Sequence, residues 1–254
     1  MSFLRIISLI LLMLSFNLHA EDKKLDALYQ LNNMTGSILI ESLDGNITYQ
    51  FNVNDKESYV PASTFKIPNT LIILEEGLIK DKSEIIKWDG KEREYKAWNK
   101  DQTLKSAFQY SCVWCYQRYA KQVGDEKYHE YLRKFKYGNS LTGNDISRFW
   151  LDGELRISVK DQINFLRKVY AEDLPIQKRH IRTLKNIMLS EENKDYQLWA
   201  KTGWSGKDGW YVGYLVTGTQ TWFFANHIEI NKQSDLVFRK KITMAALKAL
   251  NIVQ

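Results

Sequence analysis

The hydrophobic pattern of this chain divides into strand-like segments near both ends and helix-like segments between them. β-branched and aromatic residues fill 36–41 and 47–52 around the turn Asp44-Gly45-Asn46, which predicts a β-hairpin. Towards the C-terminus, a similar composition predicts three strands at 198–204, 210–217 and 221–230, separated by short turns at 205–209 and 218–220.

The middle of the chain has apolar residues at helical spacing. A first helix at 66–76 ends at Gly77, and Pro68 near its start predicts an irregular or 3₁₀ first turn. Ser158 is expected to cap one of the later helices. These later helices are predicted at 103–122, 125–136, 158–171, 175–190 and 235–250.

The order of strands, helices, strands and a helix predicts a mixed α/β (α+β) fold whose sheet uses both ends of the chain. We expect a sheet lobe of residues about 21–60 and 195–254, with a helical lobe of residues about 61–194 inserted between its two parts.

Residues 1–20 have the pattern of a cleaved export signal. Arg5 precedes the apolar run 6–14, and Ala20 precedes a polar segment. A membrane anchor is the alternative, but the run is short for a full span and no later stretch is apolar enough to cross a bilayer. We therefore expect residues 21–254 to form the mature protein, and the bacterial periplasm to be its location.

Composition and charge exclude some classes of function. The chain is 44% hydrophobic and 26% charged, with a formal net charge of +6, which is typical of a globular protein with a solvated basic surface. No basic run is interleaved with aromatic residues, so we expect no nucleic-acid partner. A mildly basic surface favours anionic small molecules.

Two cysteines, Cys112 and Cys115, are the only ones in the chain. Export permits a disulfide, but cysteines three residues apart on a helix are not guaranteed suitable geometry. Two structural thiols or a local disulfide are both favoured over redox catalysis. Two cysteines without a nearby histidine are too few for a zinc site, and we expect no metal.

The candidate chemistry lies in a serine and two lysines. Ser63 and Lys66 form a Ser-x-x-Lys motif at a helix start, and Lys201-Thr202-Gly203 lies on a predicted strand. Three residues apart on a helix, a hydroxyl and an amine share one face, and burial makes a lysine a usable base. None of the histidines has the context of a Ser-His-Asp site, and no Gly-x-Ser-x-Gly elbow is present. A serine nucleophile with a lysine base is therefore predicted.

These motifs together resemble those of a known family. Pro61-Ala62-Ser63-Thr64-Phe65-Lys66, Ser111-Cys112-Val113, Tyr137-Gly138-Asn139, Phe149-Trp150-Leu151-Asp152-Gly153 and Lys201-Thr202-Gly203 occur in the order found in class D, oxacillinase-type, serine β-lactamases. Tyr137 departs from the phenylalanine common there, and the two cysteines are not a general family feature. The resemblance implies an antiparallel sheet flanked by helices, with an inserted all-helical lobe.

The resemblance also implies roles for individual residues. Ser63 would form an acyl-enzyme in an oxyanion hole made by the backbone N–H groups of Ser63 and Trp204. Lys66 would be carboxylated by carbon dioxide or bicarbonate, with no other cofactor, and would act as the general base for acylation and deacylation. Trp150 would donate a hydrogen bond to that group, and Ser111 would relay a proton. The substrate would be bound by Lys201, Thr202, Gly203, Arg239, Val113 and Leu151.

Some alternatives stay open at this point. Trp150 fits core packing, Ser111 fits a helix cap, and Arg239 fits a solvated helix end. A covalent β-lactam sensor domain and a penicillin-binding transpeptidase are the alternative functions. The sequence leaves open the range of β-lactam substrates and the choice between monomer and homodimer.

Overall fold

A six-stranded antiparallel sheet forms the centre of the molecule. The computed structural model describes residues 23–218 and 220–254, so the expected export signal at 1–20 lies outside the described residues. The strand order is β2-β1-β8-β7-β6-β5, which places the N-terminal hairpin beside the C-terminal strands. The strands are β1 (Gly36–Ser42), β2 (Thr48–Phe51), β5 (Leu189–Glu192), β6 (Tyr196–Ser205), β7 (Asp208–Thr217) and β8 (Thr221–Glu229).

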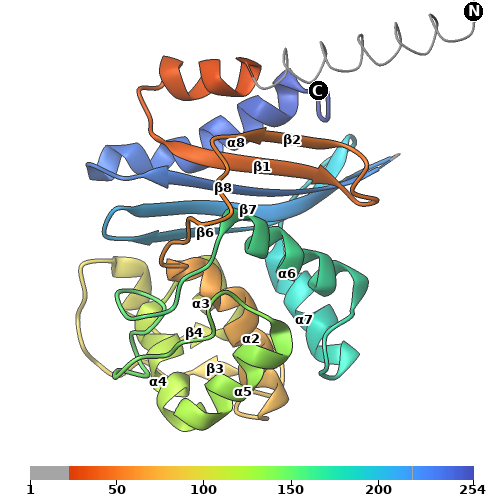
Figure 1. The fold of residues 1–254 in the computed structure, drawn as a ribbon. Helices are drawn as coiled ribbons and strands as arrows, with labels where there is room; N and C mark the ends of the chain where they lie inside the picture. Colours follow the sequence, from red (N-terminus) through yellow and green to blue (C-terminus); the bar gives the residue numbers. More distant parts are fainter. Residues whose placement is uncertain (1–22, 219) are drawn as a thin grey trace, which may run out of the picture.

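Helices cover both faces of this sheet (Figure 1). On one face, the helical residues 23–31 and α8 (Phe238–Ala249), which follows the 3₁₀ segment η3 (Gln233–Val237), bury a core against the strands. Leu25 and Ile242 share this core with Ile38 and Ile40 of β1, and all four side chains are fully buried. Because both faces of the sheet are covered, β7 and β8 are buried along most of their length.

The larger core lies on the other face, below the sheet in Figure 1. Strands β3 (Ile85–Ile86) and β4 (Gln102–Thr103) form a small second sheet, and η2 (Lys96–Trp98) lies between them in the chain. The other elements of this side are η1 (Ala62–Phe65), α2 (Lys66–Glu75), α3 (Leu104–Gln109), α4 (Val113–Val123), α5 (Asp125–Phe135), α6 (Val159–Ala171) and α7 (Lys178–Met188).

Most predicted elements are confirmed, including the antiparallel sheet and the 3₁₀ turn before α2. Ser158 caps α6 as expected, because its Oγ accepts the Asp161 backbone N–H at 3.0 Å. The single helix predicted at 103–122 is wrong: α3 and α4 are separated at Tyr110–Cys112, where Ser111 has a φ of 54°. The helix predicted at 175–190 is too long, because β5 begins at Leu189.

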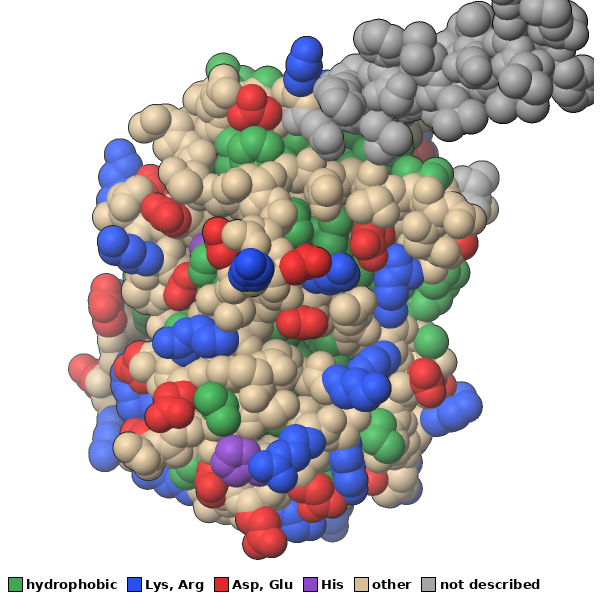
Figure 2. All heavy atoms as spheres, in the orientation of Figure 1, with side chains coloured by type: hydrophobic (Ala, Val, Ile, Leu, Met, Phe, Trp, Pro, Cys, Tyr) green, Lys and Arg blue, Asp and Glu red, His purple; other side chains and the backbone are tan. Residues whose placement is uncertain are grey.

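The face seen in Figure 2 carries basic and acidic side chains in alternation, without a large field of one sign. Among residues 23–218 and 220–254, no helix has the length and apolarity needed to cross a bilayer. The division into a sheet lobe and a helical lobe stays a prediction.

Candidate active site

Ser63 lies in η1, at the point where the chain enters the buried helix α2. Ala62, just before it, has a φ of 50°, a left-handed conformation that is unusual for alanine. Thr64 fixes this turn, since its backbone N–H and its Oγ1 both donate to the Pro61 carbonyl, at 3.1 and 2.7 Å. The Ser63 side chain therefore lines a cavity at the start of a helical segment.

Lys66 is one helical turn further on, and its Nζ donates to Ser63 Oγ at 3.2 Å. The lysine has no solvent exposure, and its Nζ lies 4.9 Å from the centre of the Tyr116 ring. Because burial removes the hydration of an ammonium group, the pKa of Lys66 falls from 10.5 to about 7. A substantial fraction of this amine is neutral near pH 7, as a proton acceptor must be.

Trp150 is fully buried and stacks on Phe65, with ring centres 5.5 Å apart. Its indole N–H is buried, and no described residue accepts a hydrogen bond from it. A buried donor without an acceptor is uncommon in folded proteins. The free N–H and the dry amine of Lys66 together fit an added carboxylate at Lys66.

Ser111 and Lys201 form a second pair of a hydroxyl and an amine. Lys201 lies on β6, and its Nζ donates to Ser111 Oγ at 2.6 Å and to the Thr202 carbonyl at 2.8 Å. Burial, together with the nearby charges of Lys66 and Arg239, holds the pKa of Lys201 well below its usual value. The two serine–lysine pairs therefore influence each other electrostatically.

Arg239 reaches the same region from α8. Its Nη1 donates to the Gly203 carbonyl at 2.6 Å and its Nε donates to the Leu236 carbonyl at 2.8 Å. Burial lowers the pKa of Arg239 to about 10. None of Lys66, Lys201 and Arg239 forms an ion pair with a described acidic residue. A guanidinium that lines the cavity without an acidic partner favours an anionic ligand.

Gly203 lines the cavity and is closely packed against η1. A Cβ at this position would lie 3.0 Å from the Pro61 carbonyl oxygen and 3.1 Å from Thr64 Cγ2. The glycine therefore lets β6 approach η1 closely, which brings Lys201-Thr202-Gly203 beside the serine.

The cavity at Ser63 has a volume of about 430 Å³. Val113, Thr202, Gly203, Trp204 and Arg239 line it, as do Ser63 and Ser111. Leu151, expected in the binding site, is not among its lining residues; its carbonyl instead accepts the Ser205 hydroxyl. Lys66 and Trp150 lie behind the cavity surface, fully buried.

Sequence reasoning missed the aromatic wall of this cavity. Tyr95, Trp98 and Tyr110 line it, together with Leu236. Trp98 is fixed there because its indole N–H donates to the Tyr110 carbonyl at 2.8 Å. These aromatic residues come from irregular segments, and no periodicity or motif marks them in the sequence.

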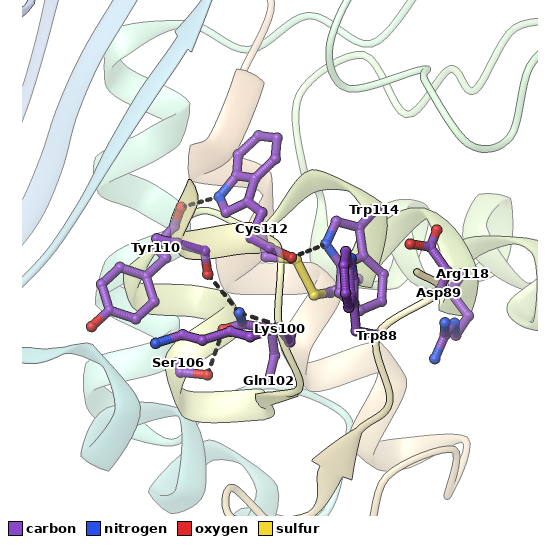
Figure 3. Close-up of a disulfide and its surroundings, with 12 residues drawn as sticks. Trp88, Asp89, Lys100, Gln102, Ser106, Tyr110, Cys112, Trp114 and Arg118 are labelled. Carbon is purple, nitrogen blue, oxygen red and sulfur yellow. Dashed lines mark hydrogen bonds between the residues drawn. A yellow bond between two sulfur atoms is a disulfide. The ribbon is translucent and has the colours of Figure 1, made fainter. Parts of the chain in front are cut away.

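Cys112 and Cys115 form a disulfide next to Ser111, drawn in Figure 3. Of the two alternatives that the sequence leaves open, two structural thiols or a local disulfide, the structure has the disulfide. In the described part of the chain, no group of three histidine, cysteine, aspartate or glutamate side chains is arranged to hold a metal ion.

The fold and this site are those of serine enzymes that recognise penicillins. The family described as the penicillin-binding protein transpeptidase domain matches residues 29–248 of the chain. β-Lactamase OXA-20 of Pseudomonas aeruginosa is 40% identical over 223 residues, which cover 86% of this chain and 84% of that protein. β-Lactamase OXA-48 of Klebsiella pneumoniae is 42% identical over 201 residues, covering 78% and 76%.

Solved structures agree with the sequence relatives. The class D β-lactamase YbXI from Nostoc is 37% identical, with a TM-score of 0.87 and coverage of 89% of this chain and 98% of that one. FUS-1 (OXA-85) from Fusobacterium nucleatum is 31% identical, with a TM-score of 0.87 and coverage of 91% and 98%. The chain belongs to the class D β-lactamase family.

Proposed function

We propose that this protein hydrolyses the lactam amide of penicillin-type antibiotics through an acyl-enzyme on Ser63, and so confers resistance to them. The observation that carries the proposal is the contact between Ser63 Oγ and the buried amine of Lys66, at 3.2 Å, behind a cavity lined by Ser63 and Arg239. The membership of the chain in the class D family supports the same reaction.

Acylation begins when Ser63 Oγ attacks the lactam carbonyl while Lys66 accepts the hydroxyl proton. The backbone N–H groups of Ser63 and Trp204 stabilise the negative charge that develops on the carbonyl oxygen. As the carbon–nitrogen bond breaks, Ser111 gives its proton to the departing nitrogen and Lys201 supplies a proton to Ser111. The 2.6 Å contact between Lys201 Nζ and Ser111 Oγ supports this relay.

Substrate orientation comes from the carboxylate that penicillin-type molecules carry. Lys201, Thr202 and Arg239 bind it, since Thr202 and Arg239 line the cavity and Lys201 adds positive potential behind Ser111. Gly203 keeps β6 close to Ser63, and Val113 provides an apolar wall. Tyr95, Trp98 and Tyr110 supply a further aromatic surface for the rest of the molecule.

Deacylation requires a base beside the ester that Ser63 forms. Carbon dioxide reacts only with an unprotonated amine, which the low pKa of Lys66 provides. When carboxylated, Lys66 supplies a carboxylate base for both half-reactions. Trp150 holds this base in place with its free indole N–H.

Export to the periplasm is part of the proposal, because the relatives are enzymes of the same family and residues 1–20 have a signal pattern. Small-molecule β-lactams are the partners, and the protein works as a monomer or a homodimer.

The proposal is tested by steady-state hydrolysis of a chromogenic cephalosporin in bicarbonate buffer. We expect many turnovers per active site in the parent protein and none in Ser63→Ala, with Ser83→Ala, at an exposed serine outside the cavity lining, as the control. Mass spectrometry should detect a transient adduct on Ser63. A single stable acylation without turnover would instead identify a covalent sensor and contradict the proposal.

A further inference from the structure

The Cys112–Cys115 disulfide lies at the start of α4, directly after Ser111 in the chain. Both cysteines are fully buried, and their Cα atoms are 5.5 Å apart. In Figure 3 the yellow bond lies beside Trp114, whose indole N–H donates to the Trp98 carbonyl at 3.0 Å. The disulfide therefore ties the segment that follows Ser111 to the body of the helix.

The start of α4 lacks the side-chain hydrogen bond that often stabilises a helix N-terminus. Cys112 occupies the N-cap position, and its side chain accepts no backbone N–H. A serine or aspartate at an N-cap contributes about 1 kcal/mol. The disulfide is a covalent substitute for this missing interaction.

Ser111 itself has a φ of 54°, a left-handed conformation that is unfavourable for a serine by about 1 kcal/mol. Such a conformation persists only where the surrounding structure imposes it. On the α3 side, the N–H groups of Ser111 and Cys112 donate to the carbonyls of Phe108 and Ala107, at 3.1 and 2.8 Å. On the α4 side, the disulfide links Cys112, the residue that follows Ser111, to Cys115 in the first turn of the helix.

We infer that the Cys112–Cys115 disulfide is a positioning element that holds the Ser111 hydroxyl at Lys201 for proton transfer. The inference rests on the proposed function, which assigns this transfer to Ser111. Reactive groups displaced by about 1 Å can lose up to about a hundredfold in rate. Loss of the bond therefore slows acylation, whereas carboxylate binding by Thr202 and Arg239 continues.

The experiment compares the oxidised protein with the same protein refolded in a phosphine reductant, which keeps both sulfur atoms and removes only the bond. Thiol titration verifies the two states, and circular dichroism verifies the fold. We expect the acylation rate of the reduced protein to fall between about tenfold and about a hundredfold, with KM changing far less.

The comparison is then repeated in two variants. In Ser111→Ala, reduction should cause no further loss, because the hydroxyl that the disulfide positions is absent. In Thr202→Ala, which lacks a carboxylate contact but keeps Ser111, reduction should cause the full loss seen in the parent. A disulfide that only stabilises the fold would instead slow all three proteins by the same factor.

Equal slowing of all three proteins, or an unchanged rate in the reduced parent, would overturn the inference. Failure of the proposed function is distinguishable, since the oxidised parent would then show no turnover at all. If the reduced protein does not refold, Cys112→Ala/Cys115→Ala replaces it in the same cycle. Alanine is chosen because a serine at position 112 could restore a helix cap.

Discussion

At the scale of single residues, the chemistry depends on a lysine kept away from water. The sequence predicts that Ser63 and Lys66 share a helical face and that apolar neighbours surround the amine, and the structure has these features. Through the family resemblance, the sequence also predicts that Ser63 and Lys66 share one site with Lys201-Thr202-Gly203, although these motifs lie far apart in the chain. It does not predict that Leu151 lies outside the cavity lining, because side-chain direction in an irregular segment depends on tertiary packing.

The stability of the protein should depend on pH through Lys66. In the unfolded chain the amine titrates near 10.5, and in the folded protein at about 7. Between these two values the unfolded state binds more protons, so the free energy of unfolding rises with pH. Below the lower value, both states carry the proton and the full penalty of burial applies.

Lys66→Met should therefore stabilise the folded protein at pH 7 by on the order of 3 kcal/mol while abolishing turnover. It should also flatten the dependence of stability on pH across this window. Urea unfolding at several pH values, in bicarbonate-free buffer, measures both effects. A variant that is less stable than its parent at pH 7 would contradict the buried, destabilised amine.

Trp150→Phe keeps an aromatic ring in the core but removes the unpaired indole N–H. Losing a hydrogen bond to a charged group costs about 2 kcal/mol, so deacylation should slow by roughly thirtyfold, with a smaller effect on acylation. Rapid-quench measurement of the two steps tests this, with Trp199→Phe, a β6 tryptophan outside the cavity lining, as the control. Equal slowing of both steps would argue against the assigned role.

At the scale of elements, the site depends on interruptions that hydrophobic periodicity does not reveal. The apolar pattern of 103–122 continues through Ser111, but the left-handed conformation there ends α3 and starts α4 in a new direction. Strand β5 begins directly after α7, without a turn signal to separate them. In both places tertiary structure overrides local propensity, and for β5 the reason is its pairing with β6.

The alignment of β6 with its neighbours should be sensitive to one glycine. A Cβ at Gly213 of β7 would lie 2.2 Å from the Trp199 carbonyl oxygen and 2.8 Å from Phe224 Cζ. Gly213→Ala should therefore destabilise the protein by about 3 kcal/mol and reduce turnover, because β6 carries Lys201 and Thr202. Gly218→Ala, where nothing lies within 4 Å, is the matched control. Thermal unfolding of the two variants should differ clearly; equal midpoints would show that the sheet accommodates the methyl group.

At the scale of the whole molecule, the site lies where distant parts of the chain meet. Ser63 comes from the helical side, Lys201 from a central strand and Arg239 from the closing helix. The order of predicted elements is enough to anticipate a sheet made from both chain ends. The shape of the cavity could not be anticipated, since Tyr95 and Trp98 reach it from a segment with little regular structure.

We propose that a dry, neutral Lys66 captures carbon dioxide and thereby acts as the base. The most direct test of this proposal measures turnover of a chromogenic cephalosporin and the NMR signal of isotopically labelled bicarbonate on the same samples. We expect the rate and a lysine-bound signal to rise together with bicarbonate, to strengthen as pH passes upward through about 7, and to be absent in Lys66→Met. Full turnover in degassed, bicarbonate-free buffer, without any bound signal, would contradict it.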